Sequence, residues 1–342
     1  MITRTESMLA AVFSRPGVVE LCERPIPRAA APDDVLIEVE GCGICGTDLH
    51  ILDVPAGHPA SAGVILGHEF LGRAVETGPE ARFIQPGDRV AVAPNLSCGR
   101  CPYCRAGLVN HCQDFTTLGI FRDGGLARFS VAPERACHPL SEDLPFEDAV
   151  WTEVLSCVTN SIDNLKPLVG ETALVIGAGP VGALHALLLK AGGVRVLVSD
   201  IQPERLRLLS GLGVDRCVNS LEEDLSEVVQ SECGLGADLV VDAVGNQLET
   251  AIQAARVGGR VSLFGMDSQA RPAVTQNSIT RKELTILGSY VGVNTFPRAI
   301  KILESGVIRP SRLISGVVGL SQLPKALQAL REGRLMKAVV KH

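Results

Sequence analysis

Short apolar segments punctuated by glycine and proline dominate the first 150 or so residues. Val35–Val39, Leu66–Val75 and Arg89–Ala93 have the length and composition of strands, and a Pro-Gly-Asp turn signal precedes the last of them. The early run MLAAVF is too short for the apolar core of a secretory signal, so it also predicts a strand. The pattern predicts an irregular, β-rich domain.

After Trp151 the apolar segments alternate between strand-like and helical periods. Strands are expected at Ala173–Ile176, Val194–Ser199, Ala237–Val241, Arg260–Phe264 and Leu284–Gly288, and helices at 181–191, 203–211, 247–257 and near 296–305. Continuous Val/Ile/Leu strands that alternate with helices are typical of a parallel sheet covered on both faces. We therefore expect an α/β fold with a doubly wound parallel sheet in this part of the chain.

Length and charge narrow the class of protein. The chain has 342 residues, enough for two domains, and its net charge of −6 gives no electrostatic support for nucleic-acid binding. No segment approaches the roughly 18–20 apolar residues of a membrane span. Eleven cysteines without a recognisable signal favour a reducing compartment, so we expect a cytoplasmic protein.

The segment LVIGAGPVG predicts a dinucleotide site, because a G-x-G-x-x-G motif joins a predicted strand to a predicted helix. Gly177 permits the tight turn, Gly179 lets the backbone approach a pyrophosphate, and Gly182 allows close packing of helix on strand. Pro180 and Val181 lie within the motif and are assigned to the same site.

Asp200 closes the next predicted strand, where a carboxylate accepts hydrogen bonds from the adenosine ribose. Its charge repels a 2′-phosphate, which favours NAD over NADP, and Arg205 softens that preference. The crevice of such a sheet lies at the carboxyl ends of its strands. Three residues at those ends are therefore assigned to cofactor binding: Val244, Gly288 and Ser289.

Four cysteines in a C-x2-C-x2-C-x7-C run predict a structural zinc site at Cys98, Cys101, Cys104 and Cys112. An iron–sulfur cluster in an electron-transfer or redox-sensing nucleotide-binding protein is the alternative of another class. Bacterial ferredoxin spacing differs, since it has three residues and not seven before the last cysteine and a proline after it. A non-catalytic nucleotide-binding protein is a third alternative.

Two further segments carry candidate ligands of a catalytic metal. GCGICGTDLH offers Cys42, Cys45, Asp48 and His50, and VILGHEF offers His68 and Glu69. Cysteine and histidine from separate loops suit zinc with an open coordination position. From the residues alone, each of these side chains can equally be a hydrogen-bonded loop residue.

The whole combination resembles the zinc-dependent medium-chain alcohol/polyol dehydrogenase family. The resemblance rests on C-G-T-D-x-H, G-H-E, the four-cysteine lobe and the glycine motif, which occur in the family's order over the full chain. It implies a GroES-like catalytic, zinc-binding domain made of residues 1–152 and 295–342, and a Rossmann domain made of residues 153–294. It also implies two Zn²⁺ per subunit, NAD, and a homodimer or homotetramer.

The resemblance further implies a role for individual residues. Cys45 and His68 resemble the first two catalytic-zinc ligands, and Glu69 resembles the carboxylate that ligates zinc or exchanges with water. Glu153, in TEVLSC, stands where the polyol and threonine branch has a ligating glutamate. Val154 replaces that branch's proline, and Cys157, one helical turn on, is a rival ligand.

Proton transfer and metal orientation are also implied by the family's pattern. Thr47 and His50 resemble its proton relay to solvent through the nicotinamide ribose, and Asp48 resembles the acceptor that orients His68. The alternative roles are a helix cap for Asp48 and a surface position for His50. His111, beside Cys112, is an alternative ligand of the four-cysteine site, although the four cysteines suffice. The remaining histidines and cysteines are expected to be packing or unpaired structural residues: His58, His185, Cys22, Cys42, Cys137, Cys217 and Cys233.

The expected reaction is hydride transfer from a secondary alcohol of a polyol, sugar or cyclitol to NAD, which yields a ketone. A glutamate ligand makes the site harder and more hydrated than a thiolate does, which suits a polyhydroxylated substrate. Oxidation of L-threonine or another amino alcohol is the alternative.

Overall fold

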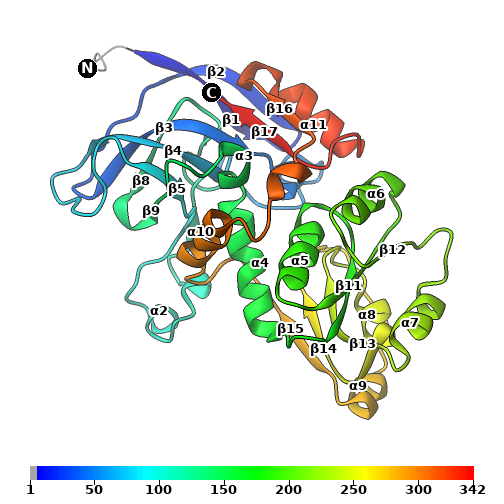
Figure 1. Cartoon of the computed structure of the whole chain (residues 1–342). Helices are drawn as coiled ribbons and strands as arrows, with labels where there is room; N and C mark the ends of the chain where they lie inside the picture. Colours follow the sequence, from blue (N-terminus) through cyan, green and yellow to red (C-terminus); the bar gives the residue numbers. More distant parts are fainter. Residues whose placement is uncertain (1–5) are drawn as a thin grey trace. The chain divides into compact units, whose positions relative to one another are not determined.

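The computed structural model describes residues 6–342 and divides into two compact units (Figure 1). The first unit comprises the chain up to Ser156 together with Val293–His342, and the second comprises Cys157–Gly292. Helix α4 (Thr152–Leu165) runs across the first boundary, so the contacts assign its opening turn, with Glu153, to the first unit. Within residues 6–342, every helix is too short or too polar to cross a bilayer.

A six-stranded parallel sheet forms the second unit, in the order β12-β11-β10-β13-β14-β15. Its strands are β10 (Thr172–Ile176), β11 (Arg195–Asp200), β12 (Arg216–Asn219), β13 (Ala237–Asp242), β14 (Ala255–Leu263) and β15 (Thr285–Gly288). Its helices are α5 (Pro180–Ala191), α6 (Pro203–Gly211), α7 (Leu225–Cys233), α8 (Leu248–Ala254) and α9 (Gln276–Lys282). The order reverses between β10 and β13, which is the switch point where a doubly wound sheet forms its crevice.

The apolar runs of the sequence become the buried central strands of this sheet. Leu174, Leu197, Val240 and Val261 have no exposed surface and pack in one cluster. Burial of each such side chain contributes about 1.5–3 kcal/mol of hydrophobic stabilisation. The alternation of apolar strands and helices therefore predicted this unit correctly.

Two local predictions differ from the structure. The helix expected over 247–257 ends at Ala254, because β14 begins at Ala255 and pairs with β13, with Ala255 opposite Ala237. The Arg256 side chain also binds Asp238 of β13 at 2.6 Å. The elements β12, α7 and α9 were not expected, because their sequences lack a clear apolar period.

A seven-stranded sheet organises the first unit, in the order β16-β17-β3-β4-β5-β9 with β8 beside β3. Its strands are β3 (Asp34–Gly43), β4 (Glu69–Thr77), β5 (Arg89–Val92), β8 (Phe129–Pro133), β9 (Cys137–Pro139), β16 (Gly316–Val318) and β17 (Ala338–Lys341). The C-terminal strand β17 runs antiparallel to β3, with Val340 opposite Cys42.

The remaining elements of the first unit are short. Two strand pairs lie outside its main sheet: β1 (Ser7–Arg15) with β2 (Val18–Pro25), and β6 (Asn95–Leu96) with β7 (Thr116–Thr117). The helices are α1 (Gly46–Ile51), α2 (Pro102–Arg105), α3 (Phe146–Ala149), α10 (Phe296–Ser305) and α11 (Leu323–Arg331). The 3₁₀ turns are η1 (Val109–His111), η2 (Glu134–Ala136), η3 (Pro310–Leu313) and η4 (Leu320–Gln322).

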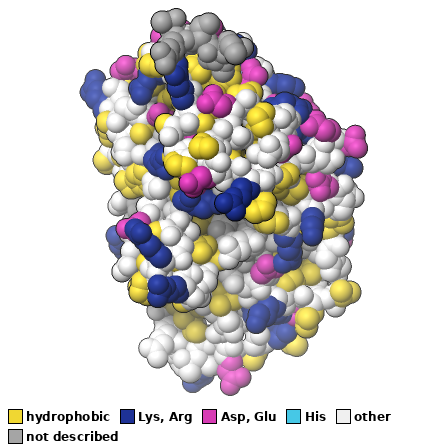
Figure 2. Space-filling model, turned by 90° about the vertical axis from the view of Figure 1, so that its left-hand side faces the viewer, with side chains coloured by type: hydrophobic (Ala, Val, Ile, Leu, Met, Phe, Trp, Pro, Cys, Tyr) yellow, Lys and Arg dark blue, Asp and Glu magenta, His cyan; other side chains and the backbone are white. Residues whose placement is uncertain are grey.

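Charge is mixed on the surface that Figure 2 shows. Lys and Arg side chains lie among Asp and Glu side chains and uncharged ones on this face. The described residues thus form no continuous basic surface there, in keeping with the net charge of −6.

Candidate active site and metal centres

Helix α1 presents Cys45 at its N-terminus. Cys45 is the N-cap residue, and its backbone N–H donates to Oδ2 of Asp48 at 2.8 Å. Thr47 lies in the same turn, with its Oγ1 3.6 Å from the Cys45 sulfur. The capping interaction that was the alternative role of Asp48 is therefore present, and it fixes the start of the helix that carries Cys45.

His68 and Glu69 reach the same place from the start of β4. Gly67 precedes them with a φ of +93°, and a Cβ there would lie 2.7 Å from the Cys42 sulfur, so this position requires glycine. The exposed fractions are 6% for His68 and 1% for Glu69. Ligand atoms of Cys45, His68 and Glu69 all lie within 4.8 Å of one another.

Burial leaves this cluster short of polar partners. Asp48 Oδ1, His68 Nδ1 and Glu69 Oε1 are buried and have no hydrogen-bond partner within the described part of the chain. Nδ1 of His68 lies 3.6 Å from Oδ1 of Asp48. Burial opposes protonation of His68, but the charges of Asp48 and Cys45 outweigh it and raise the pKa of the imidazole well above its usual value.

This environment fits a divalent cation. Thiolate, imidazole and carboxylate are the donors that zinc takes in proteins, and a cation would compensate the buried negative charges. Asp48 is placed to accept from Nδ1 of His68, which leaves Nε2 for a metal. The donor set therefore fits zinc by its chemistry as well as by its spacing.

Glu153 lies beside this cluster and not among its three grouped residues. It occupies the first turn of α4 and is 9% exposed. Its charge is close enough to raise the pKa values of His68 and Lys337, as one of the smaller contributions. Cys157 follows one turn later, at the start of the second unit.

Lys337 is the site residue that sequence reasoning missed. Its Nζ donates to Oε2 of Glu69 and to the Ile44 carbonyl at 3.1 Å, and lies 5.3 Å from the centre of the Trp151 ring. The residue is 2% exposed. Burial disfavours its charge, but Glu69 outweighs that effect and raises the pKa of Lys337. One lysine immediately before the apolar run AVV was the only signal available.

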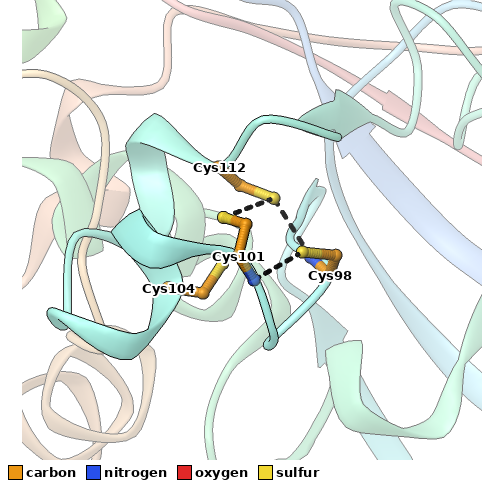
Figure 3. A group of neighbouring side chains, drawn as sticks. All are labelled: Cys98, Cys101, Cys104 and Cys112. Carbon is orange, nitrogen blue, oxygen red and sulfur yellow. Dashed lines mark hydrogen bonds between the residues drawn. The ribbon is translucent and has the colours of Figure 1, made fainter.

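The four-cysteine segment forms a second cluster (Figure 3). Ligand atoms of Cys98, Cys101, Cys104 and Cys112 all lie within 4.8 Å of one another. Backbone N–H groups point at the sulfurs: Cys98 N lies 3.2 Å from the Cys112 sulfur, and Cys101 N lies 3.3 Å from the Cys98 sulfur. Such N–H groups stabilise thiolates, which are the form that binds zinc.

Without a bound metal, the thiols of this cluster differ in pKa. Hydrogen bonds from the backbone at Gln113 and Cys104 lower the pKa of Cys101 to about 6. Burial raises the pKa of Cys104 to about 11. All eleven cysteines of the chain are free of disulfides.

The glycine motif adopts the close-packed turn that its sequence predicts. Gly177 has a φ of +99°, and a Cβ on Gly182 would lie 1.8 Å from the Gly177 carbonyl oxygen. Gly179 is the N-cap of α5 and Pro180 begins that helix, followed by Val181. The first turn of α5 therefore offers free N–H groups at the carboxyl end of β10.

Asp200 stands at the end of β11 beside this turn. Its Oδ2 accepts from Ala178 N at 2.6 Å and its Oδ1 accepts from Gln202 N at 2.8 Å. Nη1 of Arg205 lies 3.8 Å from Oδ2. The carboxylate thus holds the glycine turn in place and is itself held by the backbone.

The other residues assigned to cofactor binding follow the ends of neighbouring strands. Val244 N donates to Oδ1 of Asp242 at 2.9 Å, just after β13. Gly288 ends β15, and Ser289 N donates to the Leu263 carbonyl at 3.0 Å. The Ser289 hydroxyl is buried and has no partner within residues 6–342. These positions line the carboxyl edge where a dinucleotide lies in such sheets.

His50 lies in the last turn of α1 and is largely exposed, with Nδ1 3.2 Å from Oδ2 of Asp53. His185 is fully buried in α5, where its Nδ1 donates to the Val181 carbonyl at 2.9 Å, as a packing residue would. His58 is partly buried and donates to the Pro59 carbonyl at 2.8 Å.

Comparison with known proteins agrees with both units. The family described as "Alcohol dehydrogenase GroES-like domain" matches residues 31–142, and "Zinc-binding dehydrogenase" matches residues 180–305. L-threonine 3-dehydrogenase of Pyrococcus horikoshii is 33% identical over 98% of this chain and 99% of its own length. D-altritol 5-dehydrogenase of Agrobacterium fabrum is 34% identical over 92% of this chain and 94% of its own.

Solved structures extend the likeness to the whole fold. The RspB alcohol dehydrogenase of Escherichia coli CFT073, in complex with NADH, has a TM-score of 0.92 and 30% identity and covers 99% of this chain and 100% of its own. A protein of Sinorhizobium meliloti 1021 bound to NADP has a TM-score of 0.93 and 31% identity, with the same coverage. The predicted resemblance and fold class are thus confirmed: the chain belongs to the zinc-containing medium-chain alcohol dehydrogenase family, as a zinc-dependent NAD(P) dehydrogenase of the polyol/threonine type.

Proposed function

We propose that this protein oxidises a secondary alcohol of a polyol, sugar or cyclitol to a ketone with NAD. The observation that carries the proposal is the buried cluster of Cys45, His68 and Glu69 with Glu153 beside it. A glutamate ligand in place of a second thiolate makes a harder metal site, which suits a substrate with several hydroxyl groups. Oxidation of L-threonine is the second candidate, because a relative with that activity is 33% identical over nearly the whole chain.

In this proposal Cys45, His68 and Glu153 hold the catalytic zinc, and Glu69 lies next to it. Bound zinc supplies Lewis acidity, which makes a neighbouring hydroxyl easier to deprotonate. Asp48, whose Oδ1 lies 3.6 Å from Nδ1 of His68, would orient the ring so that Nε2 is the nitrogen left for the metal. Lys337 donates to one oxygen of Glu69 and so fixes the position of this carboxylate.

Thr47 and His50 carry the substrate proton to solvent. Thr47 lies next to the Cys45 sulfur, and His50 is exposed at the other end of the same short helix. Bound NAD would supply the acceptor for the hydride of the carbinol carbon. A proton leaves through His50 for each alcohol oxidised.

Cofactor choice rests on Asp200 in this proposal. The carboxylate is fixed by two backbone N–H groups at the end of β11, where it accepts from ribose hydroxyls and repels a 2′-phosphate. We also propose a cytoplasmic homodimer or homotetramer; the eleven free cysteines support a reducing compartment.

A substrate panel tests the proposed reaction. NADH formation is measured with polyols, cyclitols, amino alcohols and L-threonine, on protein whose zinc content is quantified. We expect turnover with a polyhydroxylated secondary alcohol at two zinc per chain. Preference for L-threonine would support the second candidate instead, and protein that holds iron and sulfide would contradict both.

Matched variants test the ligand assignment. Glu153→Ala is expected to lose turnover by at least about 10²-fold and to lower catalytic zinc content, because one of the three protein ligands is removed. Cys157→Ala, one turn further along α4, is expected to keep both. Loss of zinc and turnover in Cys157→Ala, with both retained in Glu153→Ala, would make Cys157 the ligand.

A further inference from the structure

His50, the last group of the proposed proton relay, is held by a carboxylate from its own segment. Its Nδ1 lies 3.2 Å from Oδ2 of Asp53, which follows the end of α1. An ionised carboxylate only accepts hydrogen bonds, so Nδ1 is the nitrogen that carries the hydrogen in this contact. Nε2 is then the nitrogen with the free lone pair when the imidazole is neutral.

Asp53 is in turn anchored from a distant part of the same unit. Its other oxygen, Oδ1, lies 3.4 Å from Nη2 of Arg331, at the end of α11. The same Nη2 donates to the Leu52 carbonyl at 2.7 Å and to the Leu49 carbonyl at 3.2 Å. Arg331 thus ties the C-terminal end of α1 to α11, and the two oxygens of Asp53 have separate partners.

The remaining neighbour of His50 is the loop at Gly57 and His58. Gly57 N donates to the His50 carbonyl at 2.8 Å, and a Cβ on Gly57 would lie 3.5 Å from Nδ1 of His50. Burial lowers the pKa of His58, so His58 is neutral at pH 7. Among the ion-pair contacts of the described residues, His50 therefore meets Asp53, which in turn meets Arg331 of α11.

We propose that Asp53, anchored by Arg331, is the positioning residue of the proton relay: it fixes the ring and tautomer of His50 so that Nε2 receives the substrate proton. The inference rests on the relay role of His50 in the proposed function. Nε2 accepts the proton and the ring becomes an imidazolium whose Nδ1–H stays on Asp53. Nε2 then releases the same proton to water, so the relay ends each cycle unchanged.

The pH dependence of turnover tests this inference. Asp53→Asn keeps the size of the side chain and removes its charge, so protonation of His50 becomes less favourable. We expect the acid limb of the kcat profile to move to lower pH, because a neighbouring negative charge is lost, and the shift to be small, because the pair is partly exposed. We also expect kcat to fall several-fold with little change in KM, because positioning and not substrate binding is lost.

Three further variants complete the experiment. Asp53→Glu restores a carboxylate and is expected to bring the acid limb back toward that of the natural protein. Asp143→Asn makes the same charge change at an exposed aspartate of the same unit and is expected to leave the profile unchanged. His50→Gln is expected to be slow, and added imidazole buffer should restore part of its rate, because a base from solution replaces the relay.

Two outcomes would overturn the inference in different ways. An unshifted profile in Asp53→Asn beside a slow His50→Gln would remove the role of Asp53 and leave the proposed relay intact. Full turnover of His50→Gln at low buffer concentration would remove the relay assignment itself, and the inference with it. Zinc content and thermal midpoint, measured on every variant, separate these results from loss of metal or fold.

Discussion

Lys337 and Glu69 form a buried ion pair next to the candidate catalytic cluster. Their side chains are 3% and 1% exposed, and the lysine also reaches the Ile44 carbonyl. Removing one member of a buried pair leaves the other charge uncompensated, which costs roughly 3–5 kcal/mol. The pair therefore stabilises the folded chain, independently of any part in the chemistry.

We predict that Lys337→Met lowers the free energy of unfolding by about 3 kcal/mol, and that Glu69→Gln in the same chain recovers part of the loss. Trp151 is the only tryptophan of the chain and lies against Lys337, so its fluorescence during urea unfolding reports on this place. Lys341→Met is the control. Lys341 is half exposed over Phe146 and 3.8 Å from Glu147, and its loss should change stability by less than about 1 kcal/mol. Equal effects of the two substitutions would contradict the prediction.

The four-cysteine lobe is an element with little packing of its own. It contains only the four-residue helix α2 and the three-residue turn η1. Elements this short are not stable by themselves in water, so a bound ion is the main constraint on the loop.

We predict that Cys101→Ser lowers the zinc content by one per chain and the thermal midpoint by roughly 5 °C or more. Cleavage by protease within residues 98–112 should accompany the loss, since the loop opens locally. Cys217→Ser, on β12 of the other unit, is the matched cysteine change and should keep both zinc ions. A stable but inactive Cys101→Ser protein would instead give this lobe a direct part in catalysis.

Helix α5 carries a buried histidine that makes the stability of its unit depend on pH. Burial lowers the pKa of His185 to about 4, and its ring packs edge-on against Phe264 at 4.9 Å. The unfolded chain binds this proton near pH 6.5, so it holds more protons than the folded chain between pH 6.5 and 4. Stability is therefore lost as the pH falls through that range.

We predict that lowering the pH from 7 to 5 reduces the free energy of unfolding of the natural chain by about 2 kcal/mol more than that of His185→Leu. Urea unfolding at the two pH values, on protein without nucleotide, measures the difference. A parallel loss in both proteins would mean that other groups set the acid sensitivity. The absolute stability of the variant does not enter the comparison.

At the scale of the whole molecule, the two chemistries reside in separate units. The metal-binding clusters lie entirely in the first unit, and the glycine turn with Asp200 lies in the second. Nucleotide binding should therefore survive damage to the metal site.

We predict that His68→Ala loses one zinc and all measurable turnover but binds NADH within about threefold of the natural affinity, a difference below 1 kcal/mol. Calorimetric titration with NADH checks the affinity. Asp200→Asn is the converse variant: it should keep both zinc ions and shift the preference toward NADP by about tenfold or more. Joint loss of metal and nucleotide in either variant would show that the two units depend on each other.

Much of this protein could be predicted from local sequence because the relevant physics is local. Gly177 and Gly182 stand where a Cβ would collide with nearby backbone or side chain, and the four cysteines are close enough in the chain to meet on one loop. Apolar runs predicted five of the six strands of the parallel sheet. The hydrophobic pattern missed short or polar elements such as β12. It also misplaced the end of α8, where strand pairing decides the boundary.

Only the tertiary structure decided which distant side chains complete these sites. Lys337 meets Glu69 across 268 residues, and Arg331 meets Asp53 across 278. No spacing rule connects such pairs, because the pairing of β17 with β3 brings Lys337 to the catalytic cluster, and tertiary packing brings Arg331 of α11 to the end of α1. The amino-acid sequence by itself determined the ligand types and the turn chemistry, while the burial that gives those groups their charge states exists only in the folded chain.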